Sequence, residues 1–214
     1  MRAWLGLLLA SSLGLAACMS QETKRDAIND INRAFKEDYE AILAQKGTHF
    51  ARASAGDTFD AAAAALVSLG MELRQQSRGL GFINADAPAP LPLSRSEWDR
   101  AGAADLPRAR EILSRHVGPM ALLFDFEPEG LDIVITATII EVRGGSEVSL
   151  TMRMREVAAP KSGLPRREYP PPSALQVGLD KIWGALEREL RTKARVADDD
   201  TRSRTITTTR ADSR

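Results

Sequence analysis

The stretch LDIVITATIIEVRGGSEVSLTMRMREV, residues 131–157, decides how this chain folds. Apolar side chains occupy every second position on both sides of Gly144-Gly145. They are Leu131, Ile133, Ile135, Ala137 and Ile139, then Val148, Leu150, Met152 and Met154. This alternation around a two-glycine turn predicts a β-hairpin with one apolar face. A hairpin cannot bury such a face alone, so we expect helices to cover it.

Two helices with apolar faces are predicted to cover the hairpin. The helix at 173–192, with Ser173 as its N-cap, has the clearest helical spacing. Its apolar face is formed by Leu175, Leu179, Ile182, Trp183, Leu186 and Leu190. The helix at 57–69 has Asp57 as its predicted N-cap and ends at Gly70. Its many alanines favour close packing on the sheet.

The remaining elements complete a two-layer domain over residues 48–192. Strands are predicted at 48–53, 71–76, 80–85 and 120–126. A helical insertion at about 91–118 contains a capping box that begins at Ser94, then Trp98, and a second helix that begins at Pro107. The predicted fold class is therefore α+β, with a mostly antiparallel sheet and two helices on one face, in a helix-grip-like arrangement.

An amphipathic helix precedes this domain, within the segment 18–47. Its apolar residues recur at spacings of three and four, and Gly47 ends it. They are Ala27, Ile28, Ile31, Phe35, Tyr39, Ile42 and Leu43. Two interpretations stay open: the helix packs on the domain behind it, or it forms a stalk or half of a coiled coil.

Residues 1–17 have the features of a signal peptide, with Arg2 before an apolar run too short to span a bilayer. The run ends in Leu15-Ala16-Ala17-Cys18, which resembles the lipobox of bacterial lipoproteins. The resemblance implies cleavage before Cys18 and lipidation of this residue, the chain's single cysteine. Met19 at the next position implies sorting to the outer membrane of a Gram-negative bacterium, on its periplasmic face. The alternative is an ordinary secretory signal followed by an unrelated cysteine.

Composition limits the possible partners. The chain has 29 basic and 29 acidic residues, so it offers no electrostatic case for binding nucleic acid or for strong attraction to anionic lipid. Acylation of Cys18 would leave no thiol for a disulfide. Apolar residues nearly vanish from Ala197 onward, and a disordered tail is predicted at 193–214.

The sequence predicts no catalytic, cofactor or metal site. His49 and His116 lie in separate segments without a second plausible ligand beside them. The acidic run at 198–200 lacks the spacing of a calcium loop and reads as a solvated tail. Arg153 and Arg155 form a row that either binds an anion or keeps an exposed strand soluble.

Packing motifs resemble those of a family of poorly characterised outer-membrane lipoproteins with a helix-grip domain like that of BamC, an accessory lipoprotein of the barrel-assembly machinery. The motifs are the helix that ends in Leu69-Gly70, the strand with Gly81-Phe82-Ile83, and the closing helix with Trp183. The resemblance covers roughly residues 48–192 and implies the fold, but it assigns no functional residue.

Together these features favour a non-catalytic interaction or scaffold lipoprotein of a cell-envelope complex, anchored in the membrane and bound to a protein partner. The alternative is a carrier or sensor of a small apolar ligand held between helix 173–192 and the sheet, lined by Met152, Leu179 and Trp183. Their large side chains predict a filled core instead. An enzyme is the least favoured class. We also expect Trp183 to matter more for stability than Trp98, which lies on the insertion.

Overall fold

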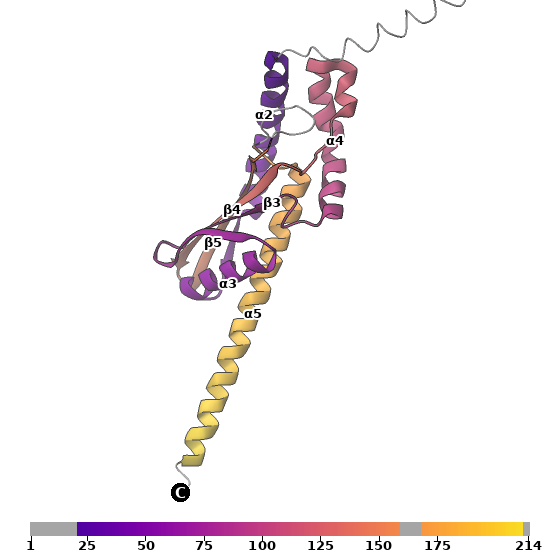
Figure 1. The fold of residues 1–214 in the computed structure, drawn as a ribbon. Helices are drawn as coiled ribbons and strands as arrows, with labels where there is room; N and C mark the ends of the chain where they lie inside the picture. Colours follow the sequence, from indigo (N-terminus) through magenta and orange to yellow (C-terminus); the bar gives the residue numbers. More distant parts are fainter. Residues whose placement is uncertain (1–20, 159–167, 212–214) are drawn as a thin grey trace, which may run out of the picture.

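The computed structural model describes residues 21–158 and 168–211, and for Gln21 and 197–211 it describes the backbone alone. This part of the chain forms four α-helices, five strands and two short 3₁₀-helices (Figure 1). In chain order they are α2 (Gln21–Lys46), β1 (Thr48–Ala51), α3 (Ala55–Ser68), β2 (Glu72–Ser77), η2 (Arg78–Leu80), β3 (Phe82–Pro88), α4 (Arg95–Val117), η3 (Gly118–Leu123), β4 (Leu131–Val142), β5 (Gly145–Glu156) and α5 (Pro172–Ala211). The predicted α+β class is confirmed.

The predicted hairpin is formed by β4 and β5 at the centre of an antiparallel sheet of order β1-β5-β4-β3-β2. The register runs from Leu131 opposite Glu156 to Val142 opposite Gly145, so the connecting turn is Arg143-Gly144. Gly144 has φ +85°, which favours glycine. Gly145 belongs to β5, where a Cβ would lie 2.1 Å from the carbonyl oxygen of Ala51 in β1. The second glycine therefore serves strand packing and not the turn.

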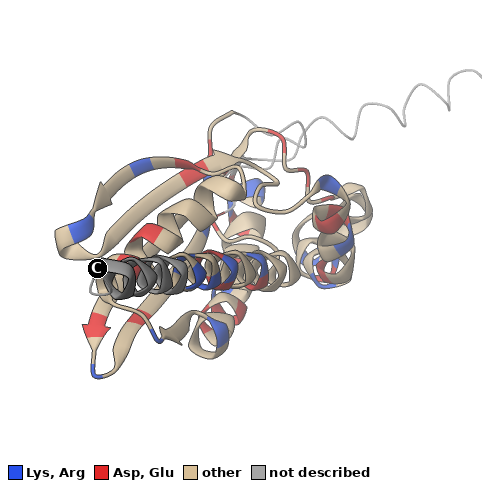
Figure 2. Cartoon of the chain, turned by 90° about the horizontal axis from the view of Figure 1, so that it is seen from below, with Lys and Arg blue, Asp and Glu red and all other residues tan. Residues whose placement is uncertain are grey.

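One face of the sheet is dry, and α3 and α5 cover it (Figures 1 and 2). Ile133, Ile135 and Ala137 of β4 are fully buried there, as are Val148 and Met152 of β5. Each buried aliphatic side chain contributes about 1.5–3 kcal/mol relative to an exposed one. The hairpin's inward residues thus supply much of the core, as its alternation predicts.

The N-terminal helix α2 packs on its own domain, which decides between the two interpretations that the sequence left open. It contacts α4 and α5, and its apolar stripe from Ala27 to Ile42 is buried in the same core as the sheet. Because the apolar residues of α2 are buried against its own domain, they are not available to form the apolar seam of a coiled coil. Within the described residues, no helix has the length and apolar character to cross a membrane.

The predicted start of α3 and the predicted helix boundary at Pro107 are both wrong. The N-cap of α3 is Ser54, whose hydroxyl accepts from the N–H of Asp57 at 3.1 Å, so the helix begins before the predicted residue. The insertion is one helix, α4, with Pro107 inside it. Proline removes one helical hydrogen bond, but α4 packs against both α2 and α5, and this packing stabilises a helix that continues through Pro107.

The segment predicted as a strand at 120–126 is also different. Gly118 (φ +56°) and Pro119 end α4, and the chain then makes the 3₁₀-helix η3 before an irregular segment leads to β4. A short apolar run does not by itself distinguish a strand from a buried turn. Here Ala121 and Phe124 are buried, whereas Leu122 and Leu123 point to solvent.

The last helix continues through most of the predicted disordered tail. α5 spans 40 residues and ends at Ala211, not at 192. The chain contains no Gly or Pro after Gly184, so nothing local breaks the helix, and Glu187 pairs with Arg191 one turn later at 3.5 Å. Basic and acidic residues intermix along it (Figure 2).

Candidate functional site

The predicted lipidation residue, Cys18, lies outside the described residues. It precedes the first residue of α2, Gln21, by three positions. The acidic run at 198–200 lies in the part of α5 where only the backbone is described.

The two histidines lie apart and each has a partner within the fold. His49 in β1 stacks on Trp183 of α5, with ring centres 4.1 Å apart. His116, in the last turn of α4, lies 2.9 Å from a carboxylate oxygen of Asp30 in α2. Among the described residues, no three His, Cys, Asp or Glu side chains gather as a metal-binding group. Both histidines therefore join elements of the fold.

The outer face of the sheet, opposite α3 and α5, carries a network of charges. The guanidinium of Arg155 donates to Asp86 at 2.7 Å and to Asp132 at 2.8 Å, and Arg74 donates to Asp86 at 2.5 Å. Asp86 is only 3% exposed. Burial alone would raise the pKa of Asp86, but the hydrogen bonds from the two arginines outweigh it and hold this pKa below its usual value. Asp86 is thus a buried, ionised centre of the network.

Arg153, the other arginine of the predicted row, lies over two aromatic rings. Its guanidinium carbon is 5.5 Å from the ring centre of Tyr39 in α2 and 5.2 Å from that of Tyr169, just before α5. Such cation–π contacts contribute about 0.5–1 kcal/mol at exposed sites and more when they are desolvated. Because both arginines are engaged by the protein itself, their geometry favours a structural role over anion binding.

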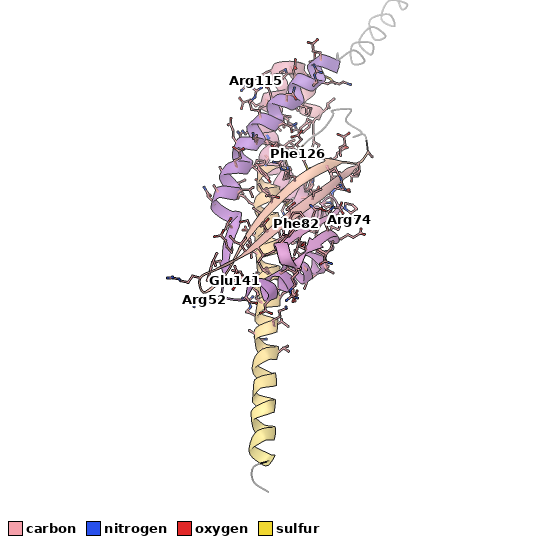
Figure 3. The ribbon with its side chains drawn as sticks, turned by 90° about the vertical axis from the view of Figure 1, so that its left-hand side faces the viewer. Arg52, Arg74, Phe82, Arg115, Phe126 and Glu141 are labelled. Carbon is pink, nitrogen blue, oxygen red and sulfur yellow. The ribbon has the colours of Figure 1, made fainter. Side chains whose placement is uncertain are left out.

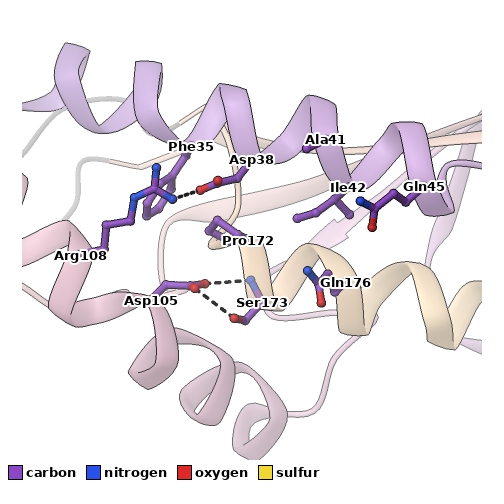
Figure 4. Close-up of a pocket in the computed structure, with 10 residues that line it drawn as sticks. All are labelled: Phe35, Asp38, Ala41, Ile42, Gln45, Asp105, Arg108, Pro172, Ser173 and Gln176. Atoms are coloured by element: carbon purple, nitrogen blue, oxygen red, sulfur yellow. Dashed lines mark hydrogen bonds and ion pairs between the residues drawn. The ribbon is translucent and has the colours of Figure 1, made fainter.

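A polar cleft of about 340 Å³ lies where α2, α4 and α5 meet (Figure 4). We call it the helical cleft. Its lining residues are Phe35, Asp38, Ala41, Ile42, Gln45, Asp105, Arg108, Pro172, Ser173 and Gln176. On one side Arg108 of α4 pairs with Asp38 of α2. On the other, Asp105 accepts from the backbone N–H of Ser173 at 2.8 Å and from its hydroxyl at 3.0 Å.

The chemistry of the helical cleft is that of a helix junction. Asp105 satisfies a free N–H at the start of α5, where a negative charge also meets the positive end of the helix dipole. Burial raises the pKa of Asp105, and the hydrogen bonds from Ser173 oppose that rise. Activation of a serine hydroxyl needs a base that is itself oriented by a third group, and the ten lining residues include no histidine, lysine or cysteine. The cleft can hold water or a small polar molecule.

The ligand site considered from the sequence, between α5 and the sheet, is occupied by side chains. Met152 and Leu179 are fully buried and Trp183 is 4% exposed. A Cβ on Gly178 would lie 2.6 Å from the sulfur of Met152, which shows how closely β5 approaches α5. The indole N–H of Trp183 donates to the carbonyl of Lys46 at 2.8 Å. These residues therefore belong to the core, as the large side chains predicted.

Sequence reasoning missed the helical cleft and the role of Asp105. Ser173 was expected to cap the last helix, but it lies inside its first turn, and the partner of its N–H comes from α4, 68 positions earlier. No local motif signals such a pairing. The sequence also did not predict the charge network around Asp86, although the Asp and Arg residues on neighbouring strands are compatible with it.

No protein-family model, curated protein or solved structure matches this chain.

Proposed function

We propose that this chain is a non-catalytic scaffold lipoprotein, anchored through Cys18 on the periplasmic face of the outer membrane and bound to a protein of a cell-envelope complex. The lipobox-like Leu15-Ala16-Ala17-Cys18 supports the anchor. The resemblance of its packing motifs to the BamC-like lipoproteins suggests outer-membrane assembly as the setting.

The observation that carries the proposal is the elongated layout of the molecule. The beginning of α2, next to the anchor in sequence, lies at one end, and α5 leaves the domain at the opposite end (Figures 1 and 3). At 1.5 Å per residue, the 40 residues of α5 extend about 60 Å. Such a layout suits a protein that holds a binding element away from a membrane.

The second half of α5, about residues 192–211, projects from the domain, and a binding partner would stabilise it. In both side views it runs beside no other described element (Figures 1 and 3). Helices in proteins gain most of their stability from tertiary packing. A helix that leaves its domain lacks this contribution until another surface packs against it. Val196, the last residue whose side chain is described, is 64% exposed.

The interior and the helical cleft support a scaffold over a carrier or an enzyme. The space between α5 and the sheet is filled by Met152, Leu179 and Trp183. The helical cleft is polar: an ion pair between Arg108 and Asp38 joins α4 to α2, and hydrogen bonds from Ser173 to Asp105 join α5 to α4. Neither feature suits a small apolar ligand, which prefers a concave and mostly apolar pocket.

A photo-crosslinking experiment in intact cells tests the proposal. A photoreactive amino acid at Val196 should give one discrete adduct with an envelope protein. Val67 on α3, a helical valine that is 54% exposed, is the matched control and should give none. The Cys18→Ser change should leave the chain uncleaved or soluble and abolish the adduct at Val196.

Two outcomes would contradict the proposal. If Val196 gives no discrete adduct, the projecting helix has no stable partner. If the Cys18→Ser chain is still processed and still fractionates with the outer membrane, Cys18 is not the anchor.

A further inference from the structure

Three exposed apolar side chains lie within four consecutive positions of η3. Met120 is 46% exposed, Leu122 67% and Leu123 76%. Isolated exposed leucines are common on protein surfaces, but a cluster of large apolar residues marks a contact site. We call these three residues the apolar turn.

The exposure of the apolar turn is built into the fold. Ala121 and Phe124, on either side of Leu122 and Leu123, are 3% and 4% exposed. The N–H of Phe124 bonds to the carbonyl of Ala121 at 3.1 Å, and the carbonyl of Phe124 accepts two bonds from Arg110, at 3.0 and 3.2 Å. Rolling the turn to bury the leucines would expose Ala121 and Phe124 and break these bonds.

The position of the apolar turn follows from how α2 and α4 pair. Arg108 bonds to Asp38, and eight residues later His116 bonds to Asp30, eight residues earlier in α2. The two helices are therefore antiparallel, so the end of α4, from which η3 starts, lies at the same end of the molecule as the beginning of α2 (Figure 1). From there η3 folds back along α4, as the bonds from Arg110 to Phe124 show. Arg115 marks this end of the molecule in Figure 3, opposite Arg52 and Glu141.

The short chain between Cys18 and α2 then decides what the apolar turn meets. Three residues reach at most about 11 Å when fully extended. If Cys18 carries acyl chains in the bilayer, the beginning of α2 is held at the lipid surface, and the apolar turn lies at this same end of the molecule. We propose that Met120, Leu122 and Leu123 insert into the outer membrane's periplasmic leaflet and orient the domain, so that α5 points away from it. This inference rests on the proposed function.

Apolar burial, and not charge, would drive this contact. Arg115 pairs with Glu111 at 2.9 Å, and the first turns of α2 contain Glu22 and Asp26 as well as Lys24 and Arg25. Opposite charges so intermixed give little net attraction to anionic lipid. The insertion should therefore persist in zwitterionic vesicles and at high salt.

Fluorescence quenching in vesicles tests the inference with the full lipidated protein. Because acylation blocks Cys18, Leu123→Cys supplies the one free thiol for an environment-sensitive dye. Leu80→Cys is the matched control, since Leu80 is also a leucine of a 3₁₀-helix and is 79% exposed. Leu80 precedes Gly81, whose carbonyl accepts a hydrogen bond from the N–H of Ile139. Ile139 lies eight residues along β4 from Leu131, the first residue of that strand, which is a distance of about 27 Å. Leu80 is therefore beside the far end of β4 from the segment that carries the apolar turn.

The expected result is a blue-shifted dye at position 123 that loses its emission when phosphatidylcholine vesicles contain a nitroxide-labelled lipid. The dye should lie about 5–10 Å below the interface, at low and at high salt alike. The dye at position 80 should keep its emission. If the protein floats with the vesicles but position 123 is quenched no more than position 80, the insertion is refuted and the anchor stands. If the labelled protein does not float, the anchor itself is refuted, and the insertion with it.

Discussion

At the scale of single residues, Glu97 connects the start of α4 to α5. One of its carboxylate oxygens accepts from the N–H of Ser94 at 2.7 Å and from the Ser94 hydroxyl at 2.9 Å, at the start of α4. It also accepts from the ammonium group of Lys181 in α5 at 2.7 Å. The hydrogen bond from Lys181, followed by those from Ser94, lowers the pKa of Glu97 to about 2.

We therefore expect Glu97→Gln to destabilise the protein in a pH-dependent manner. Because the folded pKa lies below the unfolded one, the ionised carboxylate stabilises the fold fully above about pH 4.5, and this stabilisation is lost as the pH falls toward 2. The variant should lose about 1–2 kcal/mol at neutral pH. Urea unfolding at several pH values should show the difference from the parent chain shrinking across this acidic window.

The control for this prediction is Glu111→Gln. Glu111 pairs with Arg115 one turn away, and both side chains are about two-thirds exposed, so the change should stay within about 0.5 kcal/mol at every pH. Equal pH profiles for the parent chain and Glu97→Gln would show that Glu97 contributes nothing through its charge.

At the scale of elements, the helical insertion is part of the core. Trp98 of α4 is fully buried, and its indole N–H donates to the carbonyl of Phe126 at 2.7 Å. Phe126 in turn stacks with Phe35 of α2, with ring centres 5.8 Å apart. The expectation that Trp98 matters less than Trp183 assumed an insert that loosens without opening the core, and this packing argues against it.

Trp98→Ala should therefore cost about 3–5 kcal/mol, at least as much as Trp183→Ala, because it leaves a large cavity and an unpaired buried carbonyl. Trp98→Phe keeps an aromatic ring and loses the N–H, so it should cost clearly less. Urea unfolding of the three variants measures these differences. A Trp98→Ala variant close to the parent chain in stability would restore the view of α4 as peripheral.

Which elements the sequence predicted depends on how local their determinants are. The β4–β5 hairpin was predictable because its alternation continues for nine inward residues, and a register shift of one would expose them all. The continuous α4 was not, because Pro107 is a local stop signal that only packing against α2 and α5 overrides. The helical cleft joins Asp105 to Ser173 across 68 positions, so only the folded chain brings it together.

At the scale of the whole molecule, the direction of α2 separates its own beginning from the projecting part of α5. This helix runs from Gln21 toward β1, antiparallel to α4, and ends beside α5 where Lys46 pairs with Asp180 at 2.9 Å. From there α5 continues past α3, where Lys193 bonds to Asp60 at 3.1 Å, and leaves the domain. α2 and the first turns of α5 overlap side by side, and each helix then extends toward a different end of the molecule, which accounts for the elongated shape (Figure 1).

Truncation of the chain after Val196 should shorten the molecule without weakening the domain. The last core contact from α5 is made by Leu190, which is partly buried, and Val196 is already exposed. The free energy of unfolding should thus change by less than about 0.5 kcal/mol. Removal of the 15 helical residues from 197 to 211 should reduce the maximum dimension in small-angle scattering by about 22 Å. A fall in stability of 1 kcal/mol or more, or an unchanged dimension, would mean that this segment folds back on the domain in solution, and a partner could not then use it as a projecting helix.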